Sequence, residues 1–242
     1  MDAYLIWALI GAGFITGFSK FSVGGMGLLI LPVIMIAVPG PEALAVIVPM
    51  YLITDLIAVS TYRSHIQWNV IMRLLPAGVV GGLFGGWILS AINPDDFTVM
   101  LGGVILGIIG LGFWLDYQKS NIMRHPWAAY ATGGVSGTFS IIANAAGPLI
   151  GLYLVEQELE KRAYISTRAW LFFIVNLLKV PVLLSLGLFN SDTLIMSSYC
   201  IPGLLVGSIV GYWVFNQINL KQLKWVIRAL ASIAAVKLLG FS

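Results

Sequence analysis

Three charged residues, Lys20, Asp55 and Lys179, lie within strongly apolar stretches of the chain. An ionised side chain inside a membrane costs about 3 kcal/mol on insertion scales, so it normally faces a partner or a polar cavity. We expect Lys20 and Lys179 to attract an anion, and Asp55 to carry a coupling proton, because burial disfavours a charged carboxyl group. The alternatives are a structural ion pair between Asp55 and Lys179, and a Lys20 side chain that extends to the membrane surface.

Two segments rich in small residues, 20–27 and 140–148, interrupt the apolar stretches. Glycine tolerates the positive φ of a helix break, and Pro148 suits the first turn of a new helix. A break exposes helix N–H groups and a positive dipole end, which bind anions. We therefore expect a substrate site built from both breaks and the helix after the second one. Its candidate residues are Lys20, Ser22, Gly24, Gly25, Gly27, Ser140, Asn144, Gly147, Arg168, Asn176 and Lys179, with Asp55 as the coupling residue.

Glycines also allow helices to pack closely in membranes. We prefer this explanation for four glycines spaced by four residues, and the binding explanation for the two breaks. The four are Gly81, Gly85, Gly207 and Gly211.

The composition defines the class of protein. Of the 242 residues, 59% are hydrophobic and only 10% are charged, whereas soluble chains are about one-quarter charged. The mean hydropathy is +0.95, and no Asp, Glu, Lys or Arg occurs in residues 125–155 or 193–220. Because about 20 helical residues cross a bilayer, we predict an all-α polytopic membrane protein without a soluble domain. A single cysteine excludes an internal disulfide and a cysteine metal cluster.

Turn residues and charges divide the chain into ten apolar segments. We place them at 3–20, 26–38, 41–62, 69–92, 97–117, 126–141, 146–157, 163–187, 193–216 and 220–240. The second and seventh are too short to cross a bilayer. We interpret the first as a retained span and not as a signal peptide, because it follows Asp2 and lacks a basic region.

Basic residues of the loops fall on one side if each segment reverses direction, and this side is the cytoplasmic one. Arg63, Arg124 and Arg162 are examples, whereas Glu42 and Asp192 fall on the opposite side. We expect a multi-pass protein of the plasma membrane (the inner membrane of bacteria) with both termini outside the cytoplasm.

The two halves of the sequence resemble each other. Gly81, Gly85 and Trp87 align with 207, 211 and 213, and Gly13 and Gly17 align with 133 and 137. Because each half holds five segments, the second half starts on the opposite side of the membrane. We therefore predict two inverted five-segment repeats, 1–118 and 119–242, with broken helices near the midplane, an architecture common among secondary transporters.

The glycine-rich spans and breaks, repeated in the two halves, resemble the TauE/SafE sulfite exporter family over nearly the whole chain. The residues that carry the resemblance are Gly13, Gly17, Gly24, Gly25, Gly27, Pro32, Gly133, Ser136, Gly137, Gly147, Pro148, Ser166, Thr167, Arg168, Ala169 and Asn176. The chain departs from the family pattern at Met26, which breaks the glycine triplet, and at Asn144-Ala145-Ala146, which replaces it in the second half.

The resemblance implies a transporter that exports sulfite or an organosulfonate such as sulfoacetate, driven by a proton or ion gradient. A passive anion channel or uniporter is the closest alternative, because helix dipoles and basic residues also serve conduction. An intramembrane serine protease is a weaker alternative. Gly134-Val135-Ser136-Gly137 has its signature, but the two histidines, His65 and His125, fall in predicted loops, and a nucleophilic serine needs a base within hydrogen-bond reach.

We expect no enzymatic activity, no cofactor and no metal. The expected partners are a small anionic substrate and the lipid bilayer. A net charge of +3 that is scattered along the chain argues against nucleic acid. A homodimer is compatible with the sequence.

Overall fold

The computed structural model describes residues 3–21, 27–117 and 121–215. These residues form helices and their connections, with no strand among them. The helices are α1 (Ala3–Phe21), α2 (Gly27–Ile34), α3 (Glu42–Thr61), α4 (Trp68–Ala91), α5 (Pro94–Tyr117), the 3-10 turn η1 (Asn121–Arg124), α6 (Pro126–Ala143), α7 (Gly147–Glu156), α8 (Lys161–Ser185) and α9 (Ser191–Phe215).

The predicted all-helical membrane fold is confirmed over this part of the chain. Five described helices, α1, α3, α4, α8 and α9, are long and apolar enough to cross a membrane. The second predicted segment is too long by four residues, because α2 ends at Ile34. The chain leaves the helix before Pro39, and the residue before a proline disfavours helical geometry. The tenth predicted segment, 220–240, lies outside the described residues.

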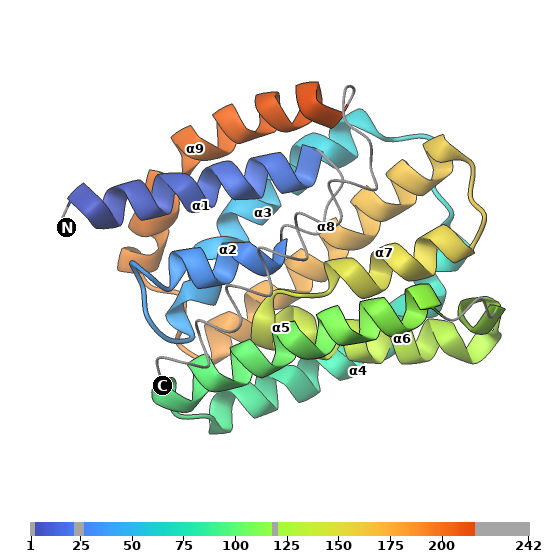
Figure 1. The fold of residues 1–242 in the computed structure, drawn as a ribbon, viewed down its shortest axis with the longest axis horizontal. Coiled ribbons are helices and arrows are strands. Elements are labelled where there is room, and N and C mark those ends of the chain that lie inside the picture. The colour runs from blue at the N-terminus through green and yellow to red at the C-terminus, as the bar shows by residue number, and fades with distance from the viewer. Residues whose placement is uncertain (1–2, 22–26, 118–120, 216–242) are drawn as a thin grey trace.

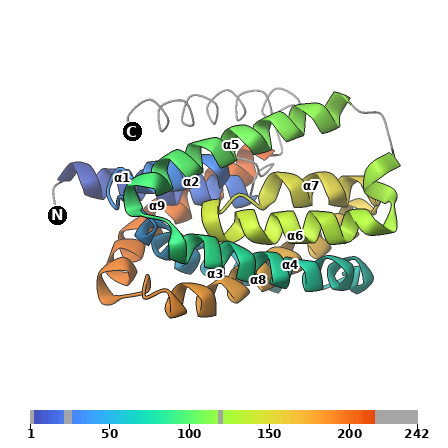
Figure 2. The same ribbon diagram turned by 90° about the horizontal axis from the view of Figure 1, so that it is seen from below.

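Two helical hairpins form the centre of the fold. In both views α2 runs back along α1, and α7 runs back along α6 (Figure 1, Figure 2). The returning helices have 8 and 10 residues, or about 12 and 15 Å of length, against about 30 Å for a bilayer core. Each returning helix is therefore too short to cross, and its first residue lies within the helical layer.

Each hairpin packs its first helix against a helix from the other half of the chain. α1 packs on α9, and α6 packs on α4. Glycines make both contacts close: a Cβ added at Gly13 would lie 1.9 Å from the Cys200 carbonyl oxygen, and one at Gly137 would lie 2.2 Å from that of Gly78. Small residues allow this approach of two backbones.

The packing role predicted for the four glycines spaced by four is confirmed. A Cβ at Gly81 would lie 2.0 Å from the Gly134 carbonyl oxygen, and a Cβ at Gly207 would lie 2.1 Å from that of Phe14. Gly85 and Gly211 are also confined, because an added Cβ would lie 2.8 and 2.7 Å from backbone oxygens.

Helices α3 and α8 connect the two packed pairs. α3 contacts α8 and α9, and α8 also contacts α4. More than half of the apolar window of α3 is buried, which makes α3 the most enclosed of the five long apolar helices. Polar side chains on α3 and α8 are therefore held inside the molecule, next to the ends of the two hairpins.

Candidate functional site

A small cavity of about 50 Å³ lies where both hairpins meet α3 and α8. Gly27, at the start of α2, lines it together with residues 144–148 between α6 and α7. The two breaks of the sequence, far apart in the chain, thus reach one place. The other residues in its wall are Ser19, Lys20, Tyr51, Ser140, Arg168, Phe172, Asn176 and Lys179.

Most of the predicted site residues lie in this wall. Those that line the cavity are Lys20, Gly27, Ser140, Asn144, Gly147, Arg168, Asn176 and Lys179. Asp55 is outside the wall but bonded to two of its members. Ser22, Gly24 and Gly25 lie outside the described residues.

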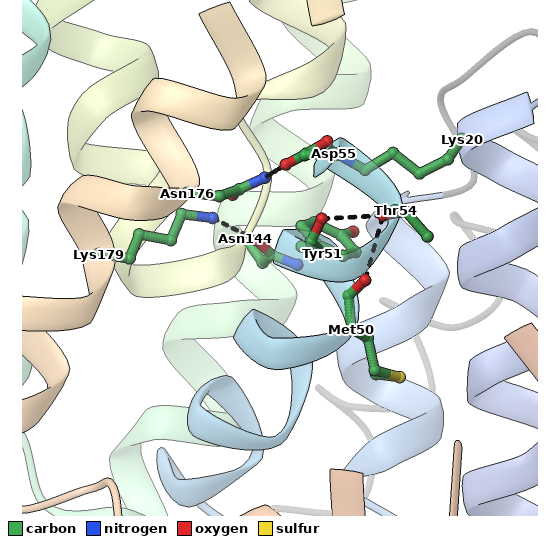
Figure 3. Close-up of polar contacts among 8 residues, drawn as sticks. All are labelled: Lys20, Met50, Tyr51, Thr54, Asp55, Asn144, Asn176 and Lys179. Carbon is green, nitrogen blue, oxygen red and sulfur yellow. Dashed lines mark hydrogen bonds and ion pairs between the residues drawn. The ribbon is translucent and has the colours of Figure 1, made fainter. Parts of the chain in front are cut away.

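Asp55 of α3 joins three helices. It is 1% exposed, and its carboxylate forms an ion pair with Lys20 of α1. Its second oxygen accepts a hydrogen bond from Asn176 Nδ2 of α8 at 2.5 Å. Both alternatives from the sequence are therefore wrong: Asp55 pairs with Lys20 and not with Lys179, and the Lys20 side chain points inward (Figure 3).

Two aromatic rings enclose the Lys20 ammonium group. Its Nζ lies 4.5 Å from the centre of the Tyr51 ring and 5.3 Å from that of Phe172. Such contacts stabilise a cation that has lost water. The sequence analysis missed both rings. The one signal for them is the repeat: Phe172 follows Tyr51 by the same number of positions by which Asn176 follows Asp55.

Lys179 is a buried cation without a carboxylate partner in the described part of the chain. It is 4% exposed, and its Nζ donates a hydrogen bond to Asn144 Oδ1 at 2.5 Å (Figure 3). A neutral amide oxygen satisfies one donor and leaves the charge uncompensated. A buried charge needs a counter-charge, so Lys179 is placed to receive an anion.

Asn144 both ends α6 and holds Lys179. Its φ of 53° is left-handed, and its backbone N–H donates to the Phe139 carbonyl oxygen. Asparagine adopts this conformation more readily than most residues. The chain can therefore reverse here, so that α7 begins at Gly147 beside the same cavity.

The beginnings of the two short helices face the cavity. The first N–H groups of a helix have no partner within the helix, and they carry its positive dipole end. Gly147 of α7 and Gly27 of α2 lie in the wall, and Pro148 lies beside Gly147 but has no N–H to donate. Tyr51 closes the space beside Gly27, since a Cβ added there would lie 3.6 Å from its hydroxyl.

The charges of the wall are positive. Lys20, Arg168 and Lys179 line the cavity, and its described wall contains no Asp or Glu. Asp55 forms an ion pair with Lys20, and no ion pair among the described residues involves Arg168 or Lys179. Two cations without such a pair and two helix N-termini therefore surround a space that fits a small anion.

Two further donors lie in the wall of the cavity. Ser140 Oγ and Asn144 Nδ2 are buried and have no hydrogen-bond partner among the described residues. The large majority of buried polar side-chain atoms have a partner. These two are thus positioned to donate to the oxygen atoms of a ligand.

The sequence matches one family, described as Sulfite exporter TauE/SafE, over residues 9–238. The chain belongs to this family. No curated protein and no solved structure matches it. Membership together with the apolar helices makes it an integral multi-pass membrane protein, and it implies a membrane exporter of sulfite or a related sulfur-containing anion.

The serine of the protease-like signature has no catalytic neighbour in the described structure. Ser136 Oγ is buried without a hydrogen-bond partner, whereas both His65 and His125 are exposed. His125 begins the same helix, eleven residues earlier, or about 16 Å away along it. The geometry therefore offers no serine–histidine pair, in keeping with a transporter family.

Proposed function

We propose that this protein exports sulfite or a small organosulfonate across the plasma membrane by alternating access, coupled to a proton or ion gradient. One observation carries the proposal: a small cavity between two helix breaks is lined by Lys20, Arg168 and Lys179 and by no carboxylate in its described wall. Such a site attracts an anion and disfavours a cation.

Lys179 is the main anion ligand in this proposal. Its neighbours Ser140 and Asn144 supply the unpaired donors, and the first turn of α7 supplies backbone N–H groups. Arg168 lies in the same wall, with its guanidinium 5.6 Å from the centre of the Phe172 ring. It guides the anion between the cytoplasm and Lys179.

The coupling residue is Asp55, and its partner Lys20 takes part in the same step. The ion pair connects α1 to α3, and the amide of Asn176 connects both to α8. Protonation of Asp55 would release Lys20 from its ion pair and leave the positive charge of Lys20 uncompensated beside the cavity. A proton on Asp55 and an anion at Lys179 would therefore favour each other, so that both would cross together and an outward-directed proton gradient would drive anion efflux.

Inverted repeats, if they rock against each other, would expose the cavity to each side in turn. Two features support them. α1 packs on α9 and α6 packs on α4, which are equivalent pairs if the second half repeats the first. The glycines at these contacts are those that align between the halves.

The proposal is tested by measuring sulfite efflux from proteoliposomes, with and without an imposed pH gradient. We expect efflux to be faster when the inside of the vesicles is more acidic than the outside. An efflux rate that does not change with any ion gradient would indicate a channel or uniporter. The absence of any sulfite or sulfonate flux would refute the proposed substrate.

A matched pair of variants on α8 tests the site. Lys179→Gln should weaken sulfite binding by about 10- to 100-fold, which corresponds to the loss of a charged hydrogen bond. Arg162→Gln removes a cation from the same helix at an exposed position outside the cavity, and it should bind sulfite like the wild type. Calorimetry on the purified protein measures both affinities, and equal values would remove Lys179 from the site.

A further inference from the structure

A second and larger cavity lies beside the polar one. It has a volume of about 270 Å³, is lined by residues of α4, α6, α7 and α8, and opens at one side, where Val79, Leu83 and Leu178 are exposed. Its wall is nearly all apolar, with Leu74, Ile141, Ile150 and Val175 among its members. An apolar cavity of about 150 Å³ already accommodates benzene. This space is therefore far larger than an inorganic anion such as sulfite requires.

The two cavities share a wall. Ser140 and Lys179 line both of them. The ammonium group of Lys179 donates a hydrogen bond to Asn144, on the side of the polar cavity. An anion bound at Lys179 thus has polar donors on one side and apolar side chains on the other.

Two serine hydroxyls lie in the wall of the larger cavity, and the hydroxyl of Ser140 also lies in the wall of the smaller one. Ser136 and Ser140 lie one turn apart on α6, and each is 2% exposed. Neither Oγ has a hydrogen-bond partner among the described residues, and both belong to the wall of the larger cavity. The Ser140 hydroxyl, which lies unpaired in the wall that both cavities share, points to a ligand that brings oxygen atoms to it.

We propose that the carried anion is amphipathic. Its sulfonate head binds Lys179 and Ser140, and its hydrocarbon chain of about four to six carbon atoms fills the larger cavity. This inference rests on the proposed function, and it defines the organic part of the substrate. An apolar chain gains free energy from leaving water, so affinity must rise with chain length until the cavity is full.

The test is a series of linear alkanesulfonates, from methanesulfonate to octanesulfonate, bound to the full chain in lipid nanodiscs. Calorimetry should show a dissociation constant that falls about fourfold with each added methylene and levels off once the chain exceeds the cavity. A dissociation constant that is the same for methanesulfonate and hexanesulfonate would overturn the proposal.

A variant that fills the larger cavity locates the chain. Gly82 lies in its wall, and a Cβ added there would lie 3.8 Å from Ile141 Cγ1, an ordinary contact. Gly82→Leu should weaken hexanesulfonate binding more than methanesulfonate binding, by about tenfold in the ratio of the two. Gly103→Leu on α5, where an added Cβ meets nothing within 4 Å, should keep the wild-type ratio.

The outcomes separate this inference from the proposed function. If Gly82→Leu keeps the wild-type ratio, the larger cavity holds a lipid chain or another occupant, and the inference is wrong while anion binding stands. If no alkanesulfonate and no sulfite binds, the proposed function itself is wrong. Should Gly82→Leu not fold, the wild-type series alone decides.

Discussion

At the scale of single residues, the site is a set of buried charges with unequal compensation. Asp55 holds Lys20 and the amide of Asn176, whereas Lys179 has the Asn144 amide and the Tyr51 ring but no carboxylate partner among the described residues. Removing one partner of a buried ion pair leaves the other charge without compensation, which costs more than removing both. The two lysines should therefore respond differently to substitution, with Lys20 important for folding and Lys179 for binding.

The ion pair between Lys20 and Asp55 predicts a non-additive pair of substitutions. Asp55→Asn and Lys20→Met should each destabilise the protein by about 3 to 5 kcal/mol, because each leaves one buried charge. The double variant should lose less than the sum of the two. Thermal unfolding in detergent measures all four proteins, and strictly additive losses would show that the pair does not act as a unit.

Asn144 has two roles that different substitutions separate. Asn144→Gly and Asn144→Ala both remove the acceptor of Lys179, so both should weaken sulfite binding. Only alanine should also strain the left-handed backbone, at a cost of about 1 kcal/mol relative to glycine. Binding and melting temperature are compared for the two variants, and a glycine variant less stable than the alanine variant would contradict this role of the backbone.

The sequence alone indicates the site residues only in part. Lys20, Asp55 and Lys179 could be found because a charge within an apolar stretch is visible without any fold. The partner of Asp55 could not, since both lysines are compatible with the pattern and only the packing of α1 against α3 decides between them. Tyr51 and Phe172 are ordinary aromatic residues in apolar helices, so their contact with Lys20 has no local signal.

At the scale of helices, the sequence predicts the elements but not their neighbours. The predicted segments agree with the nine described helices to within four residues at either end, because hydrophobicity and turn residues define them locally. The pairing of α1 with α9 joins the two ends of the described chain. Glycines spaced by four indicate that a helix packs closely, but they do not identify the partner helix.

The contact between α1 and α9 predicts opposite effects for two neighbouring glycines. Gly13→Ala would place a Cβ 1.9 Å from the Cys200 carbonyl oxygen, and should cost about 1 to 3 kcal/mol as the helices separate. Gly11→Ala, with nothing within 4 Å of its Cβ, should be neutral or stabilising, since alanine favours a helix. Unfolding temperatures decide, and equal effects would contradict the close packing.

At the scale of the whole molecule, the two hairpins open toward opposite ends. Figure 1 shows the N-terminal end of α1 and the connections α2–α3, α4–α5 and α8–α9 at one end, and the connections α3–α4 and α7–α8 at the other. Arg63 and Arg162 lie at the second end, and Glu42 and Asp192 at the first. Basic loops face the cytoplasm, so the α6–α7 hairpin would open inward and the α1–α2 hairpin outward.

This arrangement predicts the side from which two corresponding loops can be reached. Ser64 follows α3 and Ser191 begins α9, and both side chains are exposed. In Ser64→Cys the thiol should react with a membrane-impermeant maleimide only in inside-out vesicles, and in Ser191→Cys it should react in intact cells. The native Cys200 is buried, so the unmodified protein gives the background. In the proposed topology α4, α5 and α8 cross between the two positions and α6–α7 returns to its own side, so the two thiols face opposite sides. Labelling of both from the same side would mean an even number of crossings between them, and it would refute the inverted topology on which alternating access depends.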